Sequence, residues 1–100
     1  MNTSFELSIR ESIAVKCGVL HDEILDHYDQ SKEVEDARSI YYKLLFEHSL
    51  QHPTQVATMH GITLKRFQHY IIMAQSNMII YRKCEAWIYK ITNPKYGKDV

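Results

Sequence analysis

Residues 52–73 have the sequence HPTQVATMHGITLKRFQHYIIM, which predicts two short helices joined by a tight corner. Pro53 suits the first position of a helix, because its missing N–H would have no partner there. Gly61 can adopt the left-handed conformation that ends a helix, and Thr63 can cap the next helix with its hydroxyl. This pattern predicts a helix-turn-helix over about 53–75, in which the second helix enters the major groove of DNA.

The candidate DNA contacts are polar side chains of this stretch, together with one lysine upstream. They are Lys32, Thr54, Gln55, Thr63, Lys65, Arg66, Gln68 and His69. In the groove, Lys65 or Arg66 can pair with guanine and Gln68 with adenine. Thr54 and Gln55 can contact phosphates at the start of the first helix. Two cations at a helix N-terminus oppose the helix dipole, and an anionic partner would relieve that cost.

The composition suits one helical domain. The chain of 100 residues is 45% hydrophobic, and its three Gly and two Pro argue against an all-β fold with many turns. No secretion signal is evident, and no apolar run reaches the roughly 18 residues of a membrane helix. We therefore expect a cytoplasmic, all-α protein without a membrane partner. Its five to six helices form one compact domain over residues 1–92, followed by a polar tail over 93–100.

The net charge of zero argues weakly against nucleic-acid binding, but the charge is unevenly distributed. Residues 1–50 hold five Lys/Arg and ten Asp/Glu, giving −5, whereas residues 51–100 hold seven and two, giving +5. The basic half contains the predicted helix-turn-helix. Two halves that attract each other, or a solvated surface, would show the same asymmetry.

The cysteines and histidines do not form a recognisable metal pattern. Cys17 and Cys84 lie far apart in the sequence and are expected to be buried thiols rather than a disulfide. His48 and His52 are four residues apart, but a third ligand is missing. The sequence therefore predicts no metal site and no cofactor.

Three helices are predicted before the corner. Over residues 4–17, apolar positions four apart form a helical stripe that Gly18 can end. Residues 19–28 are expected to form a short helix with Leu20, Ile24 and Tyr28 on one face. The third helix begins after Ser31 as its cap and runs to about residue 49. It is apolar over much of its circumference, which indicates a central position.

One residue of this third helix, Arg38, allows several interpretations. It can pair with Glu35 or Asp36, with an acid on one of the first two helices, or with a phosphate. A pair within the fold is favoured over the phosphate.

The remaining apolar positions are expected to complete the core. In the corner these are Val56, Met59, Leu64, Phe67 and Ala74, with Ala57 as a further candidate and with either Tyr70 or Ile71. Residues 78–91 carry a wide apolar stripe, which either closes the core or pairs with a second subunit. Ser76 and Asn77 either interrupt the helix before this stripe or lie within one continuous helix.

The segment VEDARSIYYKLL, residues 34–45, resembles the long helix of the C-terminal DNA-binding domain of the bacterial replication initiator DnaA, a fold shared with the Trp repressor. Residues 50–67 resemble the helix-turn-helix of that family, with Pro53 and Thr54 at its start. The resemblance extends over about two thirds of the chain. It implies a Trp-repressor-like all-α fold and a bacterial protein that binds double-stranded DNA.

The chain also departs from that family. The family signature Gly-Gly-Arg-Asp-His-Ser/Thr-Thr-Val is replaced here by GITLKRF at 61–67, and the basic loop before the long helix retains only Lys32. No GxxxxGK[ST] run is present, so the ATPase portion of an initiator is missing.

Two functions follow from these patterns. The first is a DNA-binding module of replication or transcription, which with few cations would need a homodimer, or a larger assembly, joined through residues 78–91. The second is a helical interaction or regulatory domain that keeps the fold without binding DNA. The altered signature, the zero net charge and the aromatic last helix favour this second function. No Ser/His/Asp, Cys/His or paired-carboxylate spacing indicates an enzyme.

Overall fold

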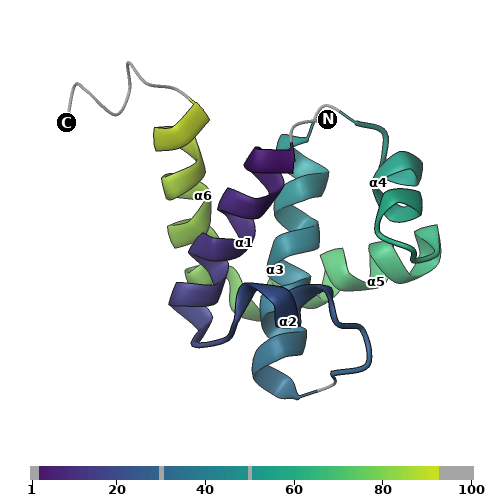
Figure 1. Ribbon diagram of the computed structural model, residues 1–100, viewed down its shortest axis with the longest axis horizontal. Coiled ribbons are helices and arrows are strands. Elements are labelled where there is room, and N and C mark those ends of the chain that lie inside the picture. The colour runs from purple at the N-terminus through teal and green to yellow at the C-terminus, as the bar shows by residue number, and fades with distance from the viewer. Residues whose placement is uncertain (1–2, 30, 50, 93–100) are drawn as a thin grey trace.

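The computed structural model describes residues 3–29, 31–49 and 51–92, which form helices and no strand (Figure 1). The helices are α1 (Thr3–Cys17), α2 (His21–Leu25), α3 (Lys32–His48), α4 (Pro53–Met59), α5 (Leu64–Met73), the 3-10 turn η1 (Ala74–Asn77) and α6 (Met78–Thr92). The all-α prediction is thus confirmed for the described residues. The predicted tail, 93–100, lies outside them. No helix in this part of the chain is long and apolar enough to cross a membrane.

Helix α3 lies at the centre and contacts every other helix. Helices α1 and α6 flank it on one side, and the α4–α5 pair extends on the other (Figure 1). Every residue from Ala37 to Leu45 is buried, which confirms the central position expected from the apolar pattern. Phe46 is exposed, however, because it follows this buried segment and meets Phe67 only at the edge of the core.

The stripe on α6 closes the core within the chain. Tyr81, Cys84 and Ile88 are buried, and α6 packs against α1 and α3. The helical path is interrupted before α6, since Ser76 and Asn77 lie in the 3-10 turn between α5 and α6. Both cysteines are free thiols, as expected, although Cys17 is only half-buried. Burial raises the pKa of Cys84 to about 11, so this thiol stays protonated near neutral pH.

Helix α2 is shorter than the predicted 19–28, and the expected apolar face does not form. Only Ile24 is buried, whereas Leu20 is exposed and the Tyr28 side chain is 97% exposed. The helix ends at Leu25, because carbonyl groups at its end are bound by an arginine of α3. Tyr28 therefore lies beyond the helix, where helical spacing no longer determines which way it faces.

That arginine is Arg38, whose side chain is fully buried. Nε donates to the Ile24 carbonyl at 2.9 Å, and Nη2 donates to the Asp29 carbonyl at 3.1 Å. The remaining partners are the carbonyls of Glu23 and Asp26 and the carboxylate of Glu35. The favoured interpretation of Arg38 is confirmed: it pairs within the fold and cannot reach a phosphate.

Several expectations of inward-facing residues need correction. Met59 is 54% exposed, because the chain turns after it and the ring of His60 occupies the inward position against Tyr41 and Tyr42. Leu64 is also exposed, since it lies in the first turn of α5, ahead of the buried contact of Phe67. The other predicted inward residues of the corner are buried: Val56, Ala57, Phe67, Tyr70 and Ala74.

Candidate nucleic-acid interface

The start of α4 is fixed by a cap that the sequence pattern did not reveal. Pro53 occupies the first turn, as predicted. The residue before it, His52, accepts a hydrogen bond from the Thr54 N–H through Nδ1 at 3.1 Å. The Gln55 side-chain oxygen accepts from the His52 N–H at 3.3 Å, which completes a reciprocal cap. Histidine is not among the usual capping residues, so the rule used for the sequence could not find it.

The corner between α4 and α5 forms as the sequence predicts. Gly61 adopts φ +69°, and the Ile62 N–H donates to the Ala57 carbonyl at 3.0 Å across the turn. Thr63 then caps α5, its hydroxyl accepting from the Arg66 N–H at 3.1 Å. These local contacts set the direction of α5 relative to α4.

A chain of partly buried polar contacts joins this corner to the centre of the molecule. His60 Nδ1 lies 2.8 Å from the Val56 carbonyl oxygen, so Nδ1 carries the proton. In the tautomer with the proton on Nδ1, Nε2 accepts from the Tyr41 hydroxyl at 2.8 Å. The same hydroxyl accepts from Arg10 Nη1 at 2.8 Å. The corner is thereby linked through α3 to α1, by residues that the sequence analysis did not single out.

All eight predicted DNA-contact side chains are exposed. Half of them already have a role within the fold. Thr63 and Gln55 take part in helix caps, and Lys32 forms an ion pair with Asp36 at 3.0 Å. Arg66 lies along α5, with Nη2 3.3 Å from the Tyr70 hydroxyl. The remaining four are Thr54, Lys65, Gln68 and His69, for which no side-chain hydrogen bond or ion pair is found within the described residues.

The charge around these side chains is uneven. The segment 26–36 holds five carboxylates and only one lysine, Lys32. On α5, the hydrogen bond to the Tyr70 hydroxyl raises the pKa of Arg66, and the carboxylate of Glu35 adds to this shift. Lys65, which forms no side-chain ion pair within the described residues, is an exposed cation of α5 that an anionic partner can reach.

The arrangement thus offers two helix starts and one exposed polar helix face, all held in place by caps and by the His60 contacts. The chain matches no protein-family model, no curated protein and no solved structure.

Proposed function

We propose that this chain is a DNA-binding module in which α4 and α5 act as a helix-turn-helix. The observation that carries the proposal is the exposure of Lys65, Gln68 and His69 on the first two turns of α5, directly after a capped corner. In this arrangement α5 lies in the major groove and α4 crosses the backbone above it. Each of the three side chains can donate a hydrogen bond to a base edge or a phosphate.

The start of α4 supplies the phosphate contact. Thr54 is exposed there, and its hydroxyl is not part of the cap formed by His52 and Gln55. Side-chain hydroxyl groups are common phosphate ligands, which position a protein on the duplex without reading its sequence.

The resemblance to the DnaA C-terminal domain and the Trp repressor supports the same use of these helices. Pro53 and Thr54 are the residues that the chain shares with that family at the start of α4. The acidic segment 26–36 differs from the family's basic loop. We therefore expect weak binding by one molecule, with a salt dependence that reflects about three to five phosphates.

Titration of the protein with random duplex DNA at two salt concentrations tests this function. We expect K65A/R66A to bind at least about tenfold more weakly and to reduce the salt slope by about two, since each cation lost removes about one phosphate contact. The matched control is R82A/K83A, which removes two adjacent exposed cations from α6. Its affinity should stay within about twofold of wild type.

Two results would contradict the proposal. One is the absence of binding at roughly 50 mM salt, where electrostatic binding is strongest. The other is an equal loss of affinity in the α5 and α6 variants, which would indicate a non-specific effect of net charge.

A second function, protein interaction, has an observation of its own. Phe46, Gln68, Ile71 and Ile72 line a shallow hollow beside the DNA-facing residues, and the Ile72 side chain is 69% exposed. Exposed apolar side chains grouped in this way are typical of contact surfaces between proteins. If the domain binds no DNA, and I72S abolishes an association seen for wild type by light scattering, the interaction function replaces the first proposal.

The oligomeric state bears on both functions. Tyr81, Cys84 and Ile88 are used inside the monomer, which leaves Ile79 and Tyr89 as the large exposed apolar residues among the described side chains of α6, 78–89. A homodimer through α6 would bring two copies of α5 to one duplex and add the cations that a monomer lacks. Light scattering at several concentrations distinguishes this dimer from a monomer.

A further inference from the structure

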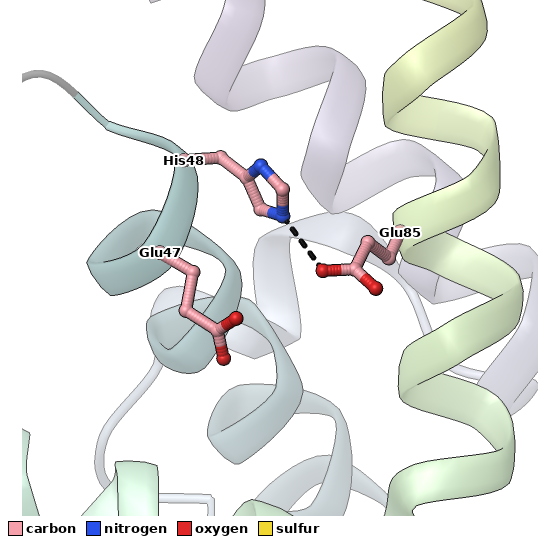
Figure 2. Close-up of side chains that lie close together, drawn as sticks. All are labelled: Glu47, His48 and Glu85. Carbon is pink, nitrogen blue, oxygen red and sulfur yellow. Dashed lines mark hydrogen bonds and ion pairs between the residues drawn. The ribbon is translucent and has the colours of Figure 1, made fainter.

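Three metal-ligating side chains meet where the end of α3 faces α6. Figure 2 shows Glu47 and His48 on the last turn of α3 and Glu85 on α6, with the imidazole of His48 directed at the Glu85 carboxylate. His48 Nε2 lies 2.9 Å from Glu85 Oε2. One ligand atom from each of the three residues lies within 4.8 Å of the others.

Neighbouring side chains hold two of these groups in place. The Tyr81 hydroxyl donates to Glu85 Oε2 at 3.2 Å, and the His48 ring meets the Tyr89 ring edge-on, with centroids 5.6 Å apart. The side chains of His48 and Glu85 are half-buried. Such outer contacts orient ligands before a metal binds, which distinguishes this cluster from acids scattered on a surface.

We propose that Glu47, His48 and Glu85 form a binding site for a divalent transition-metal ion of the zinc class. One imidazole nitrogen and two carboxylates are a ligand set that Zn²⁺ accepts, with a fourth position left for water. Metal–ligand distances of about 2.1 Å place tetrahedral ligands about 3.4 Å apart. The site reaches this geometry when the His48 Nε2–Glu85 Oε2 distance opens from 2.9 Å to about 3.4 Å and the Glu47 carboxylate moves inward by up to about 1.4 Å through side-chain rotation.

The consequence of binding would be structural. The ion would join the last turn of α3 to the middle of α6, elements whose ligands are 37 residues apart in the sequence. It would also neutralise the negative charges of the Glu47 and Glu85 carboxylates. The site lies on the α6 side of α3, whereas α4 and α5 lie on the other side (Figure 1), so this inference does not depend on DNA binding.

One neighbouring side chain, Lys43, opposes metal binding and so provides a further test of the site. Lys43 Nζ lies 2.6 Å from Glu47 Oε1, and it lies 5.2 Å from the centre of the Tyr81 ring. The ammonium group repels a dication and occupies one of the Glu47 oxygens. Removing this charge should therefore strengthen metal binding, an effect opposite in direction to the loss of a ligand.

Isothermal titration of the full chain with zinc chloride tests the site. Wild type should bind one ion. H48Q and E85Q should each bind at least about tenfold more weakly, and K43M should bind more tightly than wild type. The matched controls are H69Q and E33Q, which change an exposed histidine and an exposed glutamate elsewhere and should bind as wild type does. Calcium chloride should bind far more weakly than zinc, because Ca²⁺ takes oxygen ligands and makes no use of the imidazole.

Thermal unfolding gives a second readout. Zinc at about 100 times its Kd should raise the Tm of wild type by roughly 10 °C, and a tenfold loss of affinity should leave H48Q with about half of that shift or less. Should H48Q fail to fold, E47Q replaces it, since Glu47 is the most exposed of the three ligands.

The proposal is overturned by any of three results. The first is no zinc binding by wild type up to about 100 μM. The second is wild-type affinity in both H48Q and E85Q. The third is calcium binding as strong as zinc binding.

Discussion

Helix α2 and the α4–α5 corner are both short, yet their boundaries are set in different ways. The corner is defined by residues within it: Pro53 begins α4, Gly61 turns the chain and Thr63 caps α5. The end of α2 is defined by Arg38, which binds the Ile24 carbonyl from 14 residues away. Local rules of helix capping therefore describe the corner correctly and misplace the end of α2.

The largest expected effect on stability comes from removing the Arg38 side chain. R38M should lower the free energy of unfolding by about 3 kcal/mol or more, because four carbonyl groups and Glu35 lose a buried cationic partner. Chemical denaturation measures the change. E35Q serves as the control and should cost clearly less, since the carbonyl contacts remain. Equal losses in the two variants would mean that the ion pair, and not the end of α2, determines the effect.

The next effect concerns the glycines at the two helix ends. G61A should cost about 1–2 kcal/mol, because alanine is disfavoured at φ +69°. G18A is a matched variant: its φ is +70°, and neither added methyl group would touch a neighbour. Both variants should lose similar stability in denaturation experiments, but only G61A should weaken DNA binding. If G18A weakens DNA binding as much as G61A does, the weaker binding results from lower stability alone.

A smaller effect is expected from the side-chain cap of α5. T63A should destabilise the protein by about 1 kcal/mol, because the Arg66 N–H loses its partner. The comparison is S31A at the start of α3, where the Ser31 hydroxyl makes no capping hydrogen bond, contrary to the sequence prediction. S31A should therefore be nearly neutral when thermal unfolding is measured. A loss in S31A as large as that in T63A would contradict this distinction.

The smallest effect is a dependence on pH near α2. Burial, and then the charge of Arg38, lower the pKa of His27 from its ordinary value of 6.5. The neutral ring is thus favoured in the folded state. Its contribution to stability is complete above about pH 6.5 and is lost as the pH falls through the unfolded value toward the folded one. The stability of wild type should fall as the pH drops through about 6.5, and that of H27Q should fall less.

The control for this experiment is H69Q, which lacks an exposed histidine and should keep the wild-type dependence. An unchanged slope in H27Q would assign the pH dependence to another group.

The helices could be predicted from the sequence because most of the patterns that define them are local. The buried segment 37–45, the start of α4 and the caps of the corner each depend on residues within about one helical turn. The exposed positions of α5 were likewise found from helical spacing. What these residues bind is a separate matter, and it remains a prediction.

Most of the missed features involve partners far apart in the sequence. His60 reaches Tyr41 across 19 residues, and His48 reaches Glu85 across 37. No spacing rule relates such residues, because their distance depends on how helices pack. His52 is a different case, because its cap is local. Histidine is not among the usual capping residues, so the capping rule does not select it.

The Arg38 contacts also have a consequence for the order of folding. The carbonyls of Glu23, Ile24 and Asp26 gain their arginine partner only when α3 has formed and Arg38 has been buried. A five-residue helix is too short to persist alone in water. We therefore expect α2 to become ordered after α3, so that I24V mainly accelerates unfolding, whereas substitutions within 37–45 also slow refolding.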